Sequence, residues 1–196
     1  MIFKLACIVE GHGEVSAVPI LLRRLAAEID CNIELTIPQP IRLDRSKLKR
    51  DGELEKAMQL AIAKIDANGG VLILMDSDDD CPAQLGPALL KRARSIRPDF
   101  PVSVVIATRE YESWFIAAAP SLSQRFHTAT TEVGNVESIR GAKEWLQKSL
   151  KNNRYSPTVD QPSLTAQFNL QQARSASSSF DKLWREIAHM LSSKAV

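Results

Sequence analysis

The chain has 196 residues, of which 44% are hydrophobic and 24% are charged, and its formal net charge is +2. These values exclude a disordered polyampholyte, a collagen-like chain and a low-complexity array. A chain of this length fits one domain that folds without disulfides or a structural metal. The three cysteines are widely spaced and form no C-x-x-C pair, which fits a reducing, cytoplasmic setting. No apolar run has the length of a membrane span or the layout of a signal peptide.

Strand-like and helix-like segments alternate over the first 119 residues. Residues 2–9 are a near-continuous apolar run, and apolar residues at spacings of three and four then predict a helix to about residue 30. Further strands are predicted at residues 31–37, 71–75 and 102–107, and further helices at 54–65, 83–97 and 111–119. Gly69 and Gly70 are expected to end the helix at 54–65. This alternation predicts an α/β fold with a mainly parallel, four-stranded sheet flanked by helices.

The remaining residues show no strand signal. Helices are predicted at residues 138–150 and 180–191, with a polar stretch containing prolines and a serine run between them. We therefore predict two parts, an α/β core over residues 1–119 and a helical C-terminal appendage over residues 120–196 that packs on the core.

Acidic residues follow three of the four predicted strands. They lie in the segments Glu10-Gly11-His12-Gly13-Glu14, Asp76-Ser77-Asp78-Asp79-Asp80 and Thr108-Arg109-Glu110-Tyr111-Glu112. Because the carboxyl ends of parallel strands meet at one edge of a sheet, we expect these carboxylates to lie close together. Carboxylates in close contact repel each other by about 1–4 kcal/mol per pair, which a hard divalent cation offsets. The sequence therefore predicts a Mg²⁺ or Mn²⁺ site at this edge.

The spacing suggests how the acidic residues would act. Asp76 and Asp78 are two residues apart, so in an extended backbone they face the same way and can share one ion. The Gly11 and Gly13 turn precedes a helix N-terminus, and both features favour a bound anion. Several of the acidic positions also have ordinary alternatives. Asp79 and Asp80 can form a solvated turn that caps the next helix, Glu14 can be a first-turn partner of the helix dipole, and Glu110 or Glu112 can be a helix-start carboxylate.

The order of these motifs resembles the Toprim domain of topoisomerases, bacterial primases and OLD-type (overcoming lysogenisation defect) nucleases. The Glu10-Gly11-x-Gly-Glu14 form is most similar to the OLD-type nucleases. The phrases Ile8-Val-Glu-Gly, Leu74-Met-Asp-Ser-Asp and Arg109-Glu-Tyr-Glu-Ser-Trp-Phe resemble an uncharacterised bacterial Toprim-like family. In that family the chain is often paired with a separate ATPase.

The resemblance implies a Toprim-like fold and roles for particular residues. Glu10 corresponds to the acid/base or metal-binding glutamate, Asp76 and Asp78 to the D-x-D metal ligands, and Glu14 to the second glutamate. Glu112 would complete a second metal position. The implied reaction is Mg²⁺- or Mn²⁺-dependent phosphodiester hydrolysis on nucleic acid, DNA rather than RNA, in genome defence with a separate ATPase. No topoisomerase-style tyrosine domain is visible in the sequence.

Basic residues surround the acidic segments in the sequence. Residues 42–50 contain five basic residues and one acidic residue, and residues 120–196 contain ten basic and six acidic residues. This pattern suits a polyanion laid over bound metal. The candidate nucleic-acid contacts are Lys47, Lys49, Arg50 and Arg109, together with Gly11 and Gly13 at the turn. A second basic run at residues 91–97 is equally consistent with a solvated helix face.

Two other functions remain open at this point. The chain can be a non-catalytic or partner-activated docking subunit of an ATPase complex, with the acidic edge binding metal structurally. It can also be a haloacid-dehalogenase-like phosphatase, because Asp76-Ser-Asp78 mimics the D-x-D start of that family. The phosphatase alternative is weaker, since that motif ends the first strand of its fold and here follows the third predicted strand.

Overall fold

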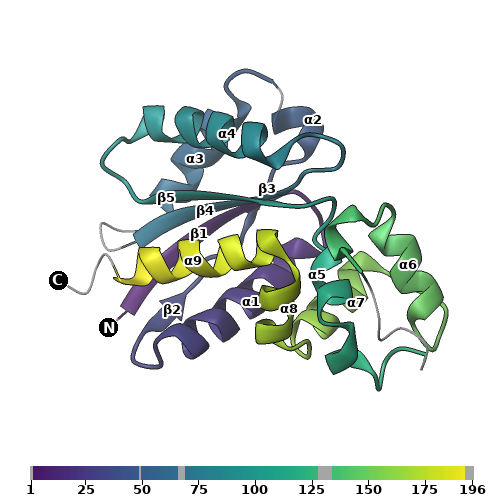
Figure 1. Cartoon of the computed structure of the whole chain (residues 1–196). Helices are drawn as coiled ribbons and strands as arrows, with labels where there is room; N and C mark the ends of the chain where they lie inside the picture. The colour runs from purple at the N-terminus through teal and green to yellow at the C-terminus, as the bar shows by residue number, and fades with distance from the viewer. Residues whose placement is uncertain (1, 49, 66–68, 128–133, 193–196) are drawn as a thin grey trace.

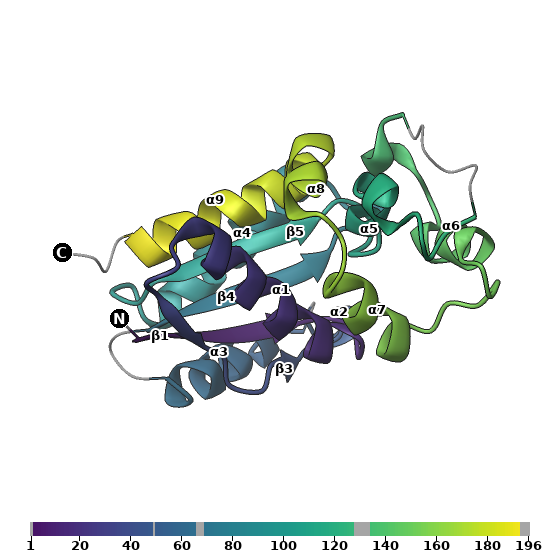
Figure 2. The same ribbon diagram turned by 90° about the horizontal axis from the view of Figure 1, so that it is seen from below.

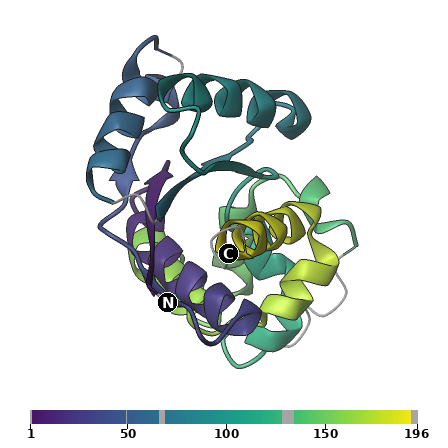
Figure 3. The ribbon, with the colours of Figure 1, turned by 90° about the vertical axis from the view of Figure 1, so that its left-hand side faces the viewer.

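The computed structural model describes residues 2–48, 50–65, 69–127 and 134–192. In these residues a parallel sheet lies between two layers of helices (Figures 1 and 3). The long strands are β1 (Ile2–Val9), β4 (Gly69–Asp76) and β5 (Val102–Ala107), and the short ones are β2 (Glu34–Thr36) and β3 (Ile41–Arg42). The strand order is β2-β1-β4-β5, with β3 also paired to β1, and every pairing is parallel. The predicted α/β fold class is confirmed.

Each face of the sheet packs against its own helices. Helices α3 (Glu53–Ala63) and α4 (Pro82–Ile96) cover one face, whereas α1 (Glu14–Ile29) and α9 (Ser178–Ser192) cover the other (Figure 3). Side chains alternate between the faces, so Leu74 packs on the α1 side and Met75 on the α3 side. Both faces are apolar, which explains why β4 and β5 are buried along their whole length.

The chain after β5 wraps around the carboxyl ends of the strands. There it forms α5 (Ser113–Ala117), α6 (Ala142–Ser149), α7 (Pro157–Thr165) and α8 (Leu170–Ala176), with 3-10 turns at Ala119–Leu122 and Val136–Ser138. Helix α9 then returns along the sheet beside α1 (Figure 2). Aromatic contacts join these segments, with ring centroids 5.2 Å apart for Trp114 and Phe180. None of the helices in the described ranges is long and apolar enough to cross a membrane.

The region between α1 and α3 differs from the prediction. Strand β2 covers only Glu34–Thr36, because the Asp30 carboxylate accepts a hydrogen bond from Asn32 N (2.9 Å) and turns the chain first. Strand β3 and helix α2 (Arg45–Leu48) were not predicted. The Asp44 carboxylate accepts a hydrogen bond from Lys47 N (3.1 Å), which caps this short helix.

The prediction that Gly69 and Gly70 end a helix is wrong. Both lie in β4, and neither leaves room for a side chain. A Cβ atom on Gly69 would lie 2.5 Å from Lys4 O, and one on Gly70 would lie 2.3 Å from Met190 Cε. These glycines therefore allow close packing of β4 against β1 and α9.

The polar stretch of the tail contains two helices that the sequence did not predict. Pro157 occupies the first turn of α7, where its missing N–H has no cost. The Asn169 side chain caps α8 by accepting a hydrogen bond from Gln172 N (2.9 Å). The helix predicted at residues 138–150 is shorter, since α6 begins only after Gly141, whose φ is 71°.

Candidate functional site

The strand ends bring together four carboxylates that were predicted from the sequence. Glu10 follows β1, Glu14 begins α1, Asp76 ends β4 and Glu112 precedes α5. We call these four residues the carboxylate cluster. Glu10 and Asp76 meet because β1 and β4 are neighbours, and Asp76 N donates a hydrogen bond to Glu10 Oε2 (3.3 Å). A cavity of about 360 Å³ opens at the cluster, lined by Glu10, Glu14 and Asp76 among others.

The carboxylate of Glu14 folds back over the turn that precedes its helix. It accepts a hydrogen bond from Glu10 N (3.1 Å), and the N–H of Gly11 also points to it. The expected anion at this turn is therefore the Glu14 side chain itself. Burial nevertheless outweighs these hydrogen bonds and raises the pKa of Glu14 to about 7.

The second glycine of the turn serves packing. A Cβ atom on Gly13 would lie 2.1 Å from Gln161 Oε1 and 2.4 Å from Pro157 O, both of which belong to α7. Gly13 thus lets α7 approach the turn and form one wall of the cavity.

Asp76 lies at the centre of the carboxylate cluster. It is 8% exposed, and its Oδ1 accepts a hydrogen bond from Tyr111 N (2.8 Å). Burial raises the pKa of Asp76 well above its usual value, and the Glu14 and Glu112 carboxylates raise it further. Burial and then Asp78 likewise raise the pKa of Glu10. The cluster therefore concentrates negative charge that its hydrogen bonds do not neutralise.

Glu112 has one satisfied and one unsatisfied oxygen. Its Oε1 accepts hydrogen bonds from Tyr155 OH (2.8 Å) and Gln161 Nε2 (3.1 Å). Its Oε2 is buried and has no hydrogen-bond partner among the described residues. Burial raises the pKa of Glu112 as well. The Lys143 ammonium group lies 3.8 Å from Oε2, beyond hydrogen-bonding distance, so this buried oxygen keeps a free coordination position that a bound cation would fill.

A lysine that was not predicted completes the site. Lys143, from α6, places its Nζ 2.8 Å from Glu110 Oε1 and 3.8 Å from Glu112 Oε2, and it lines the cavity. Burial alone would lower the pKa of Lys143, but the Glu112 and Glu110 carboxylates outweigh it and raise the pKa. Lys143 is therefore a fixed positive charge beside the cluster.

Asp78 and Asp80 both pair with Arg45. Strand β4 ends at Asp76, and Asp78 has a left-handed backbone with φ of 48°. Asp78 therefore lacks the extended backbone on which the expectation that it faces the same way as Asp76 depended. Asp78 Oδ2 lies 3.5 Å from Arg45 Nε, and Asp80 forms an ion pair with the same guanidinium. Both aspartates are about half exposed, and after burial the charge of Asp78 is the next cause that raises the pKa of Glu10.

Two arginines fix the loops that carry the acidic residues. Arg45 donates to Asp76 O (2.7 Å) and Ser77 O (2.9 Å), which holds the connector against the end of β4. Arg109, with φ of 67°, donates to Asp78 O (3.0 Å) and Asp79 Oδ1 (2.8 Å). Their guanidinium groups therefore hold the ends of β4 and β5 in place, a role that the sequence did not indicate.

The remaining basic candidates lie at the surface. Lys47 and Arg50 are exposed. After Lys56, their positive charges help to lower the pKa of Glu53. Lys49 lies outside the described residues. In the basic run at residues 91–97, Arg92 pairs with Glu55 (2.9 Å), which joins α4 to α3.

The carboxylate oxygens of the cluster are of the kind that a hard divalent cation prefers, but the side chains are not arranged around one ion position. In the described ranges, no three His, Cys, Asp or Glu side chains already converge as a metal site. The carboxylates instead accept hydrogen bonds from backbone N–H groups, Tyr155 and Gln161. Their oxygens, their mutual repulsion and the unsatisfied Glu112 Oε2 are the features that a Mg²⁺ or Mn²⁺ ion matches.

Fold and site together define an α/β protein with a buried carboxylate cluster at the carboxyl edge of a parallel sheet. A family model described as a domain of unknown function (DUF4276) matches residues 9–188, and the chain belongs to this family. Neither the curated proteins nor the solved structures gave a match.

Proposed function

We propose that this protein is a metal-dependent phosphodiesterase that acts on nucleic acid, a Toprim-type nuclease or nickase. The observation that carries the proposal is the unsatisfied Glu112 Oε2 within a cluster of four carboxylates. The order of Glu10, Glu14, Asp76 and Glu112 along the strand ends supports it, because it is the order of the Toprim motifs. A role in genome defence beside a separate ATPase belongs to the same proposal.

In this proposal Glu14, Asp76 and Glu112 hold the cation and Glu10 moves a proton. A Mg²⁺ or Mn²⁺ ion held there would supply Lewis-acid chemistry to the phosphate and to the attacking water. Glu10 lines the cavity and is half-buried, and burial raises its pKa. A carboxylate with a raised pKa is the better general base near neutral pH.

Lys143 and the loop arginines would bind the phosphates of the substrate. The Lys143 ammonium group lines the cavity, so a phosphodiester placed there would lie against its positive charge. Arg109 and Arg140 both pair with Asp79, at 2.8 Å and 2.9 Å, and border a neighbouring hollow. Together with the exposed Lys47 and Arg50 they would surround the nucleic acid with positive charge.

Nicking of supercoiled plasmid with Mg²⁺ or Mn²⁺ tests the proposal. We expect wild type to nick DNA, and Asp76→Asn and Glu112→Gln to be about a hundredfold slower, because the cation would lose a ligand. Asp99→Asn is the matched control, because Asp99 is exposed and pairs with Arg97, two residues away at the surface. Equal cutting by Asp76→Asn would contradict the assignment. A labelled RNA and a small aryl phosphate in parallel assays separate DNase from RNase and phosphatase activity.

One observation favours a partner-activated subunit as the second candidate. The carboxylates are bonded to the chain's own N–H groups and paired with Lys143, so the described residues show no ready-made ion site. In this alternative a partner such as an ATPase would rearrange the site or use it only for docking. Nicking that appears only when the ATPase is added would support activation, whereas nicking by the purified chain would exclude it.

A further inference from the structure

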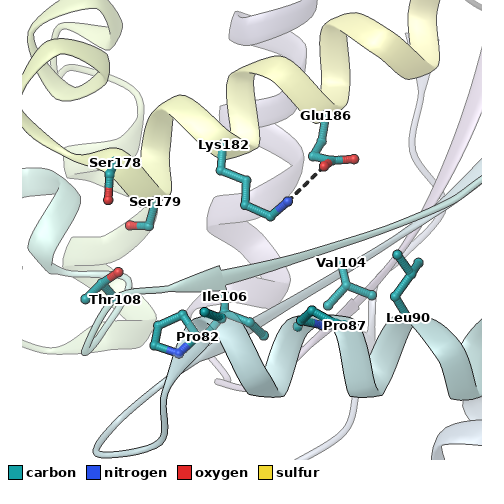
Figure 4. A pocket seen from close by; sticks show the side chains of 12 residues that line it. Pro82, Pro87, Leu90, Val104, Ile106, Thr108, Ser178, Ser179, Lys182 and Glu186 are labelled. Carbon is teal, nitrogen blue, oxygen red and sulfur yellow. Dashed lines mark hydrogen bonds and ion pairs between the residues drawn. The ribbon is translucent and has the colours of Figure 1, made fainter.

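The buried polar atoms that lack a hydrogen-bond partner gather at one place in the molecule. In the described ranges they are three side-chain oxygens, Glu112 Oε2, Ser113 Oγ and Gln161 Oε1. None of them lines the other large cavity, of about 400 Å³ between α4 and α9, where Lys182 and Glu186 pair with each other (Figure 4). The unsatisfied atoms therefore belong to the surroundings of Glu112, and two of them come from side chains that are bonded to each other.

The tail of the chain holds the Glu112 carboxylate by one oxygen. Tyr155 OH donates to Oε1 at 2.8 Å, and Gln161 Nε2 donates to the same atom at 3.1 Å. Among the described residues no donor reaches Oε2, and Lys143, which lines the cavity at the carboxylate cluster, lies 3.8 Å from it. Two donors on Oε1 thus hold the carboxylate in one orientation and leave Oε2 bare on the side of Lys143.

The orientation of the Gln161 amide follows from this contact. A carboxylate oxygen accepts hydrogen bonds, so Nε2 faces Glu112 and Oε1 faces the other way. There Oε1 is buried without a donor against Gly13, whose Cβ position lies 2.1 Å from it. A buried carbonyl oxygen without a donor lowers stability. The contact is made even though it leaves Oε1 unsatisfied, which indicates that Gln161 serves the carboxylate rather than the stability of α7.

Helix α7 is anchored by contacts outside the carboxylate cluster. Arg24, from α1, donates to Thr165 O at 2.6 Å and to Phe168 O at 2.9 Å, at the C-terminal end of α7. At the other end, Gly13 lets the first turn of α7 approach closely. Because both ends are fixed, the helix presents Gln161 to the cluster in one position. Groups that hydrogen-bond to a metal ligand in this way orient the ligand and increase the affinity for the metal.

We propose that Tyr155 and Gln161 are positioning residues that set the affinity of the site for its divalent cation. By holding Oε1 they keep Glu112 Oε2 free for the ion. Without the two donors the carboxylate can turn, and the ion must then order it. This role rests on the cation site of the proposed function, but it does not require nuclease activity. It also makes the tail of the chain a determinant of how tightly the cation is held.

Calorimetric titration of Mn²⁺ into Tyr155→Phe and Gln161→Leu tests the proposal. Each variant removes one donor to Glu112. We expect each to bind Mn²⁺ about tenfold more weakly than wild type, because the ligand loses part of its support. Gln167→Leu is the matched control and should bind as wild type does, since Gln167 is exposed and its amide donates to Ser163.

A double-mutant cycle separates positioning of the carboxylate from a general loosening of the fold. In the Glu112→Gln background, Gln161→Leu should change the Mn²⁺ affinity by less than about twofold, because the carboxylate through which it acts is already gone. Urea unfolding without metal shows which variants are folded. If Gln161→Leu fails to fold, Tyr155→Phe, which removes a single oxygen atom, still decides the test.

Unchanged Mn²⁺ affinity in either folded single variant would overturn the proposal. A further tenfold loss when Gln161→Leu is added to Glu112→Gln would overturn it as well. Absence of Mn²⁺ binding by wild type would remove the cation site itself, and with it both this role and the proposed function. Mn²⁺ binding by wild type without any nicking would instead remove the nuclease proposal alone.

Discussion

Lys143 and Glu112 form an ion pair, with 3.8 Å between Nζ and Oε2, in which the carboxylate is fully buried. The two residues come from different parts of the chain, Glu112 from the loop after β5 and Lys143 from α6 in the tail. The tail therefore supplies the positive charge that faces the carboxylate cluster. The ion pair stabilises the fold and also lies in the proposed active site. Replacement of either residue therefore tests both its contribution to stability and its contribution to activity.

Replacement of Lys143 by methionine should destabilise the protein by about 1–2 kcal/mol, because a buried carboxylate loses its cation. We expect this modest loss of stability because the Lys143 side chain is 41% exposed, so water partly screens its charge. Urea unfolding measures the change. Lys148→Met, on an exposed position of the same helix, is the control and should change stability little. Equal losses in both variants would contradict the role of the pair.

The stability of the protein should fall as the pH rises through the range in which Glu14 ionises. Burial raises the pKa of Glu14 from 4.5 to about 7, so between these values the folded chain holds a proton that the unfolded chain has released. The free energy of unfolding then decreases with pH, by at most about 1.4 kcal/mol per pH unit for one group.

Glu14→Gln should flatten this profile, and urea unfolding between pH 4.5 and 7 measures it. Glu34→Gln, at an exposed position of β2, is the control and should keep the wild-type slope. Mg²⁺ should raise the melting temperature more near pH 7 than near pH 4.5, since ionised carboxylates bind it better. A wild-type slope in Glu14→Gln would show that burial of this carboxyl does not govern the profile.

Replacement of Arg45 should weaken the end of β4. Its guanidinium bonds two backbone carbonyls and pairs with Asp78 and Asp80, and its side chain is 17% exposed. We expect Arg45→Ala to cost about 2–3 kcal/mol, and Arg45→Lys to recover little, because an ammonium group lacks the forked geometry. Thermal unfolding tests this, with Arg42→Ala as the neighbouring control. Full recovery by Arg45→Lys would mean that charge alone matters.

Gly13→Ala should displace α7 from the turn. The new Cβ would overlap Gln161 Oε1 at 2.1 Å and Pro157 O at 2.4 Å, and the second of these is backbone that cannot rotate away. We expect a loss of more than about 2 kcal/mol, as for other overpacked sites. Gly134→Ala is the control, since no atom lies within 4 Å of its Cβ position. Circular-dichroism melts compare the two, and equal stabilities would contradict this packing.

The sequence predicted the parts of the fold and site that follow from local pattern. The central strands are buried on both faces and therefore appear as continuous apolar runs. Glu10, Asp76 and Glu112 follow such strands, and parallel geometry alone brings them to one edge. Their meeting could be predicted without any knowledge of side-chain packing.

Other parts of the site depend on tertiary contacts that leave no local signal. Lys143, Tyr155 and Gln161 come from the tail, and only the packing of α6 and α7 brings them to Glu112. The direction of Asp78 depends on its left-handed backbone, which aspartate tolerates but does not require. In a sequence, a glycine pair that allows close packing looks the same as a glycine pair that ends a helix. This explains the wrong prediction at Gly69 and Gly70.

The most direct measurement is calorimetric titration of Mn²⁺ into wild type, Asp76→Asn, Glu112→Gln and the control Asp99→Asn. If the carboxylate cluster holds a divalent cation, wild type and Asp99→Asn will bind Mn²⁺, and the two cluster variants will bind it about tenfold more weakly or not at all. Unchanged affinity in both cluster variants, or no binding by wild type, would contradict the central claim.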